Sequence, residues 1–353
     1  MPKAEPPAFL AELAGAVEAE LARLIDHESD VWTTNDSDLV VPFDEMRALV
    51  LAGGKRLRPA FCLLGALAAG GGPTDAVIRA GAALELLHAM ALFHDDVIDS
   101  SATRRGNETA HVRNARVHRD RGWSGSSERF GEGVAILVGD LAYVYADRLM
   151  EDMPLSVRQA WTQMRIEVNV GQYLDVLGSA RRDFTAASAA RIALLKTAKY
   201  TIERPLHIGA LIANPDSSPA LLDALSGYGV SLGTAFQMRY DILGVFGEPD
   251  VTGKPAGDDL REAKPTALVA AAIDNADEAQ RRILDRIGDP DLDSRDVADI
   301  RRVIVDTGAL DSAEQRIVEL TESACDSLAA IDMSDDVRDK FTSLAHVVAW
   351  RSA

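Results

Sequence analysis

The sequence predicts an all-α protein, with one helical domain over residues 1–353. Hydrophobic residues make up 47% of the chain and aromatic residues only 5%, while alanine and leucine are plentiful, a mixture that favours helices over sheet. The length would also suit two domains. However, cationic and acidic motifs are scattered from Gly54 to Lys264 and make chemical sense only if they converge. We therefore expect a single domain.

Charge and cysteine content exclude several classes of partner. The net charge of -18 argues against nonspecific nucleic-acid binding and predicts no basic patch for anionic lipid. Cys62 and Cys325 are far apart in apolar helical patterns, so a reducing compartment is expected. The N-terminus does not resemble a signal peptide, and no run approaches the ~20 apolar residues of a membrane span. We expect a cytoplasmic protein with small-molecule partners and no integral membrane association.

The first helical segments surround a cationic motif. Residues 7–24 alternate apolar and charged positions as an outer amphipathic helix does. Within residues 44–70, GGKRLRP separates two apolar helical runs and concentrates Lys55, Arg56 and Arg58 at a helix start. A helix N-terminus with basic side chains is suited to an anion. The motif would equally suit a charged helix start on the surface.

Residues 85–106, ELLHAMALFHDDVIDSSATRRG, begin as a helix with almost no polar face, which predicts burial. Asp95 and Asp99 then stand one turn apart with Asp96 beside them, at a helix end where negative charge is unfavourable. Carboxylates without His or Cys suit Mg²⁺, which completes its shell with phosphate oxygens. Arg104 and Arg105 follow closely and point to a phosphate or diphosphate ligand. A solvated acidic helix end paired with two arginines is the alternative.

The sequence DDVID followed by RRG resembles the first aspartate-rich motif of the trans-isoprenyl diphosphate synthases, or polyprenyl synthetases. The resemblance extends over most of the chain and implies helices around a deep central cavity. GGKRLRP resembles the family's GGKxxRP, which implies that Lys55 and Arg58, with Gly54, bind the diphosphate of isopentenyl diphosphate. His88 matches a further position that touches this diphosphate, although a lone His on an apolar helix is more often a core residue.

The middle of the chain adds further matches. Residues 111–135 are rich in Gly, Ser, Arg and charge and predict a surface loop, after which a helix carries Asp140 at a structural family position. The sequence GQYLD resembles the family's GQxxD, in which Gln172 and Asp175 extend the polar wall around the metals. The pair Lys196 and Thr197 resembles the family's KT, whose lysine reaches the allylic diphosphate.

Residues 236–266 resemble the family's second block, FQxxDDxLD followed by GKxxGxDLxxGKxT, with two departures. Tyr240 and Gly244 stand where aspartates are usual, which leaves Asp241 as the carboxylate of that triplet. A neutral phenol is a poor substitute for a metal-binding oxygen at pH 7. Asp259 matches the DL position, and Asp258 beside it is a candidate replacement ligand. Beyond residue 267 we expect supporting amphipathic helices.

The resemblance implies the following sets of residues. The metal ligands would be Asp95, Asp99 and Asp241. The catalytic set would be Asp95, Asp96, Asp99, Arg104, Lys196, Asp241 and Lys254. The substrate-binding set would be Gly54, Lys55, Arg58, His88, Arg104, Arg105, Lys196, Thr197, Gln237, Lys254 and Lys264. Three Mg²⁺ ions would bind in the substrate complex, one of them weakened by Tyr240.

The implied reaction is head-to-tail condensation of isopentenyl diphosphate with an allylic diphosphate, in a homodimer. Ala91 lies one turn before Asp95 with Met90 beside it, so these side chains point along the growing tail. Short-chain relatives often carry an aromatic there, so a C20 product, geranylgeranyl diphosphate, is expected. Two alternatives remain. Tyr240 motivates a noncatalytic subunit of a heteromeric synthase, and a class I terpene cyclase would share the first acidic motif but have no use for GGKRLRP.

Overall fold

The computed structural model describes residues 8–104, 106–247, 257–289 and 291–350, and these are almost entirely helical. This confirms the all-α prediction. The N-terminal half contains α1 (Ala8–Thr33), the short 3₁₀ helix η1 (Ser37–Leu39), α2 (Val40–Val50), α3 (Leu57–Ala68), α4 (Asp75–Ile98), α5 (Ala110–Asp120), α6 (Ser127–Leu149) and α7 (Leu155–Arg181). Strands β1 (Thr103–Arg104) and β2 (Asn107–Glu108) pair as an antiparallel hairpin directly after α4.

The C-terminal half begins with α8 (Ala186–Ile192), which continues into a π-helical segment, η2 (Ala193–Glu203), and then α9 (Arg204–Ala213). The long helix α10 (Pro219–Phe246) follows. The remaining described elements are α12 (Asp258–Arg261), α13 (Ala267–Asn275), α14 (Glu278–Leu284), α15 (Ser294–Asp306), α16 (Ala309–Ser327) and α17 (Asp335–Ala349).

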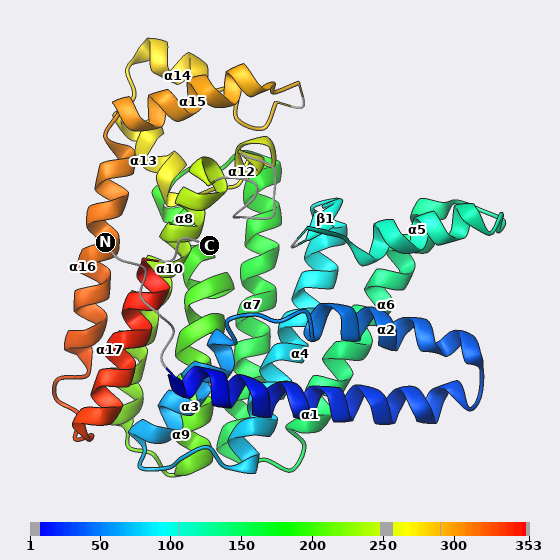
Figure 1. Ribbon diagram of the computed structural model, residues 1–353. Coiled ribbons are helices and arrows are strands. Elements are labelled where there is room, and N and C mark those ends of the chain that lie inside the picture. Colours follow the sequence, from blue (N-terminus) through cyan, green and yellow to red (C-terminus); the bar gives the residue numbers. More distant parts are fainter. Residues whose placement is uncertain (1–7, 105, 248–256, 290, 351–353) are drawn as a thin grey trace.

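Helices α4, α6, α7 and α10 run in similar directions through the middle of the molecule, and α1 packs across α4 near one end (Figure 1). Helix α4 packs on α3 and α6, while η2 is held between α7 and α10. Helices α13 to α15 gather at the opposite end from α1. This arrangement places the acidic end of α4 near the C-terminal end of α10 and the short helix α12.

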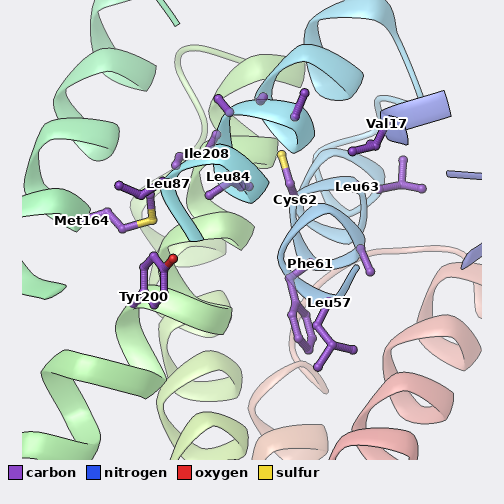
Figure 2. Close-up of a cluster of buried hydrophobic side chains, with 14 of the residues drawn as sticks. Val17, Leu57, Phe61, Cys62, Leu63, Leu84, Leu87, Met164, Tyr200 and Ile208 are labelled. Atoms are coloured by element: carbon purple, nitrogen blue, oxygen red, sulfur yellow. The ribbon is translucent and has the colours of Figure 1, made fainter. Parts of the chain in front are cut away.

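The main hydrophobic core explains the apolar composition of α4. Figure 2 shows Leu84 and Leu87 of α4 in one cluster with side chains from α3, α7, η2 and α9. Helix α4 starts at a Thr74 cap, whose side chain accepts from the Val77 amide. By length and composition this helix could span a membrane, but 67% of its most apolar stretch is buried inside the protein. Burial in the core therefore accounts for its apolar character.

The segment 111–135 differs from the predicted loop. Helix α5 covers most of its first half, and α6 begins at Ser127 after a Ser126 cap that accepts from the Arg129 amide. Its polar residues are used in packing: Asn114 is buried and donates to Glu45 and to the Ala110 carbonyl. The prediction was wrong because a high charge content concealed a buried stripe that includes Ala115 and His118.

Candidate active site

A cavity of about 520 Å³ opens at the junction of α3, α4, α7, η2, α10 and α12. Its polar lining includes Lys55, Arg58, Glu85, His88, Asp95, Asp99, Arg104, Gln172, Asp175, Lys196, Thr197, Gln237, Tyr240, Asp241, Asp258, Asp259 and Lys264. Its apolar lining includes Leu57, Ala91, Leu92, Val168, Ile192, Phe236 and Leu243. Motifs that are more than 200 residues apart in sequence thus face one space.

Helix α4 contributes one continuous stripe to this cavity. Glu85, His88, Ala91, Asp95 and Asp99 recur every three or four residues, which is the spacing of one helical face, and all line the cavity. The stripe changes from polar at Glu85 through apolar at Ala91 to acidic at Asp95. A single helix therefore places polar groups at both ends of an apolar section.

Protein cations compensate the acidic end of α4. The Lys264 ammonium lies 2.9 Å and 3.0 Å from the two carboxylate oxygens of Asp99. Asp95 accepts a 3.1 Å hydrogen bond from Gln172, and the Arg104 guanidinium lies 3.6 Å from its carboxylate. These contacts balance charges that would otherwise repel each other and oppose the helix dipole.

Asp96 has a different position from Asp95 and Asp99. Its side chain is buried and lies outside the cavity lining, where it accepts from Nε of Arg104 at 2.7 Å. Burial raises the pKa of the Asp96 carboxyl, against the opposing effect of the Arg104 guanidinium. Asp96 thus holds Arg104 in place, and Arg104 itself faces the cavity.

The π-helical segment η2 brings Lys196 and Thr197 to the cavity. Gly171 allows this approach, because a Cβ there would lie 2.8 Å from the Lys196 Cα. The Lys196 ammonium is 2.7 Å from the Asp175 carboxylate, and Lys264 lies 3.6 Å from the same residue. Burial acts to lower the pKa of Lys264, but the charges of Asp175, Asp99 and Glu262 outweigh it and hold the pKa above its ordinary value.

Residues of the second acidic block lie on α10. Asp241 is only 4% exposed and accepts a 2.7 Å hydrogen bond from Gln237, whose amide oxygen accepts from the Thr197 hydroxyl. Burial raises the pKa of Asp241 to about 7; the neighbouring Asp259 carboxylate adds to the rise, while the Gln237 hydrogen bond opposes it. Tyr240 is 39% exposed, and its ring packs edge-on against Phe236 with centroids 4.7 Å apart.

The GGKRLRP motif divides into two roles. Lys55 and Arg58 line the cavity, together with Gly54. Arg58 donates to the Thr201 hydroxyl at 3.2 Å, and its guanidinium lies 4.4 Å from the Tyr200 ring centroid. Arg56 also borders the cavity, but it is mostly buried in a left-handed backbone conformation, where it binds Glu85 at 2.6 Å and Glu18 at 2.9 Å. Arg56 therefore anchors the motif to α4 and α1.

Sequence reasoning missed Tyr200, Thr201 and the Arg56–Glu85 ion pair. Tyr200 and Thr201 follow Lys196 and Thr197 by one turn, so helical spacing alone could have indicated them. Met90 was expected beside the growing tail, but it lies in the hydrophobic core and outside the cavity lining. Arg105 and Lys254 lie outside the described residues.

The cavity's acidic side chains fit Mg²⁺ chemically. Asp95, Asp99, Asp175, Asp241 and Asp259 offer hard carboxylate oxygens. Within the described lining, His88 lies about two turns before Asp95 on α4, and the lining includes no Cys. In the described part of the chain, no three acidic, His or Cys side chains already form a metal cage. Mg²⁺ characteristically uses one or two carboxylates and takes its other ligands from water and substrate phosphates. The ion pairs of Asp99 with Lys264 and of Asp95 with Arg104 show that the carboxylates at the end of α4 attract cations.

Comparisons with known proteins identify the family. The polyprenyl synthetase family model matches residues 43–305. The chain belongs to the polyprenyl synthetase family. It is 36% identical over 298 residues to geranylfarnesyl diphosphate synthase of Aeropyrum pernix, covering 81% of this chain and 86% of the relative. It is also 37% identical over 233 residues to geranylgeranyl diphosphate synthase of Mycobacterium tuberculosis, covering 65% of this chain and 61% of that one.

A solved structure agrees over nearly the whole length. Geranylgeranyl pyrophosphate synthase from Corynebacterium glutamicum, complexed with isoprenyl diphosphate and magnesium, superposes with a TM-score of 0.91 at 39% identity. The match covers 97% of this chain and 99% of the other. The polyprenyl synthetase fold around this cavity is therefore shared, and the chain is a trans-prenyltransferase of this family.

The burial of Asp241 predicts a pH-dependent stability gain from its removal. A carboxyl whose pKa is raised on folding costs stability once it ionises, so the penalty is absent near pH 4, grows up to about pH 7 and persists above it. We expect Asp241→Asn to stabilise the metal-free protein at pH 8 by on the order of 2 kcal/mol, with little effect at pH 4.

Urea unfolding of both proteins in EDTA at the two pH values measures this difference. Asp140→Asn, at a half-exposed carboxylate on α6, serves as the control for a simple charge effect. An equal gain at both pH values would contradict the prediction.

Proposed function

We propose that this polyprenyl synthetase condenses isopentenyl diphosphate head-to-tail with an allylic diphosphate and yields geranylgeranyl diphosphate. The observation that carries the proposal is the shared cavity, which holds the cations of GGKRLRP and the carboxylates of Asp95, Asp99 and Asp241 together. An acidic region suited to a metal-bound diphosphate and a separate cationic region match a reaction of two diphosphates.

The acidic region would bind the allylic substrate. Asp95, Asp99 and Asp241 would hold Mg²⁺, with three ions in the full complex, and bound Mg²⁺ would neutralise the departing diphosphate. Arg104, Lys196 and Lys254 would add positive charge to the same leaving group, with Lys264 and Gln237 supporting it. Lys264 and Arg104 already lie on these carboxylates, so they are positioned to exchange carboxylate partners for phosphate oxygens.

The cationic region would bind isopentenyl diphosphate. Lys55, Arg58, His88 and Arg105 would hold its diphosphate so that its double bond faces the allylic carbon, which supplies proximity and orientation. Thr197 orients Gln237 beside Asp241, and the apolar wall of Phe236 and Leu243 would keep water from the cation. Attack by the isopentenyl double bond would leave a cationic carbon on the isopentenyl unit. The departing diphosphate is the base that would take a proton from the carbon next to it, and the electrons of that C–H bond would form the new double bond.

The C20 length is supported by the small side chain of Ala91 on the cavity wall. Leu87 of α4, one turn before Ala91, and Met164 of α7 are fully buried in the hydrophobic core and lie outside the cavity lining (Figure 2). The named relatives include two geranylgeranyl diphosphate synthases, and the Aeropyrum relative is named for a product one isoprene unit longer.

Replacing Ala91 with a large side chain should shorten the product. We expect Ala91→Phe to shift the main product from C20 to C15, because the ring would occupy the space that the last isoprene unit needs. Chromatography of radiolabelled products by chain length measures this. Met90→Phe is a matched control, since Met90 faces the core instead of the cavity. An unchanged profile for Ala91→Phe would place the limit elsewhere.

Tyr240 motivates the alternative of a noncatalytic subunit. The direct test incubates purified protein with labelled isopentenyl diphosphate, Mg²⁺ and each of the C5, C10 and C15 allylic diphosphates. We expect elongation of at least one starter by the chain alone. Folded protein that binds diphosphate yet elongates none would favour the subunit, and Tyr240→Asp would then be tested for gain of turnover. A cyclase would instead convert an allylic diphosphate without consuming isopentenyl diphosphate.

We also propose that the protein is a cytoplasmic homodimer. Large apolar side chains are exposed on two neighbouring helices: Ile136, Leu137 and Val144 on α6, and Leu155, Ile166, Val170, Tyr173 and Val176 on α7. The two helices are linked by an ion pair between Arg165 and Asp147 at 2.8 Å. Exposed apolar side chains gathered on two helices in this way favour a second copy as their partner.

Charges on this surface should separate the dimer. We expect the double variant Leu137→Asp/Tyr173→Asp, at side chains that are 63% and 65% exposed, to sediment as a monomer. Val305→Asp on α15, at a similarly exposed apolar residue outside this surface, should leave the mass unchanged. Sedimentation equilibrium measures both, and a monomeric wild type would contradict the proposal.

A further inference from the structure

Gly244 lies on α10 one turn after Asp241, so the two positions share a face of the helix. A Cβ at Gly244 would lie 2.5 Å from Cγ of Asp259 and would overlap Oδ2 of the same carboxylate. These separations are too short for non-bonded atoms. The Asp259 carboxylate therefore occupies the space that a side chain at position 244 would need.

Asp259 is held in this position by its own segment. Helix α12 starts after Gly257, whose φ of 76° belongs to the left-handed region that favours glycine, and Leu260 is fully buried. The Asp259 carbonyl accepts from the Lys264 amide at 3.0 Å, and the Leu260 carbonyl accepts from the Gly288 amide at 2.8 Å. The carboxylate is thus presented by a fixed backbone.

The position of the Asp259 carboxylate matters because Asp241 faces the same cavity. Asp241 and Asp259 line the same cavity and interact electrostatically as like charges. Such a pair is unfavourable unless a cation joins it. Between positions 240 and 244 of α10, Asp241 is the only carboxylate in the sequence. Tyr240 takes one of the usual aspartate positions and packs on Phe236.

We propose that Asp259 supplies, through the space left by Gly244, the second carboxylate of the Asp241 metal site. The inference rests on the proposed Mg²⁺-dependent function and replaces Asp258, the ligand suggested by sequence, with its neighbour. The aspartate absent at position 244 of the α10 motif is then replaced by a carboxylate from a different segment, α12.

Mn²⁺ binding in the presence of inorganic diphosphate tests this without turnover. Electron paramagnetic resonance counts free and bound Mn²⁺ for the wild type and for Asp259→Asn, which keeps the side-chain volume. We expect the affinity of the weakest bound Mn²⁺ to fall by about tenfold or more, as for loss of a supporting metal ligand. Asp258→Asn should leave that affinity close to wild type. Equal binding by Asp259→Asn and wild type, or loss confined to Asp258→Asn, would overturn the proposal.

Moving the carboxylate from α12 to position 244 on α10 provides a second test. Gly244→Asp alone should weaken Mn²⁺ binding, because its side chain collides with Asp259. The double variant Gly244→Asp/Asp259→Ala returns the carboxylate to α10, and it should recover most of the affinity lost in Asp259→Ala. A double variant that folds but binds no better than Asp259→Ala would count against the proposal.

If the Gly244 variants do not fold, the comparison of Asp259→Asn with Asp258→Asn decides alone. The product assay on the wild type is independent of both tests. If Asp259→Asn loses Mn²⁺ and the wild type makes no product, the proposed synthase function is rejected but the Asp241–Asp259 metal site is retained.

Discussion

The structure depends on the neutralisation of negative charge at the C-terminal end of α4. Asp95, Asp96 and Asp99 stand together where the helix dipole is least favourable to them. The compensating groups come from three other segments: Arg104 from β1, Lys196 from η2 and Lys264 from the turn after α12. Because each of these cations must reach α4, the requirement also determines how distant segments close around the cavity.

The carboxylates at the end of α4 would have different partners in the metal-free protein and in the substrate complex. The same carboxylates that would bind a cation in the substrate complex bind protein cations in its absence. Asp96 and Arg56 lie outside this exchange, since each is buried in an ion pair that orients a neighbouring group. Buried pairs of this kind contribute little net stability, but breaking one leaves an unpaired buried charge.

The sequence predicted the helical class and most of the cavity lining, because apolar periodicity and charged motifs are local signals. It could not predict which partners each member of a motif binds. Arg56 and Arg58 both border the cavity, yet Arg56 is buried in ion pairs with Glu85 and Glu18, whereas Arg58 contacts Thr201 and Tyr200. Helix α5 was missed because its buried stripe depends on a tertiary partner, α6. The approach of Asp259 to Gly244 joins two segments through packing that no local pattern encodes.

The stripe on α4 also constrains how such a protein can change over evolution. From Glu85 to Asp99 the helix rises about 21 Å at 1.5 Å per residue. The number of residues between two positions of the stripe determines whether both side chains face the cavity. Inserting or deleting one residue between His88 and Asp95 would rotate the two ends by about 100° relative to each other. One end would then face the core. Substitutions along the stripe are tolerable where changes in its length are not, so lineages can diverge here in side-chain size while the spacing stays fixed.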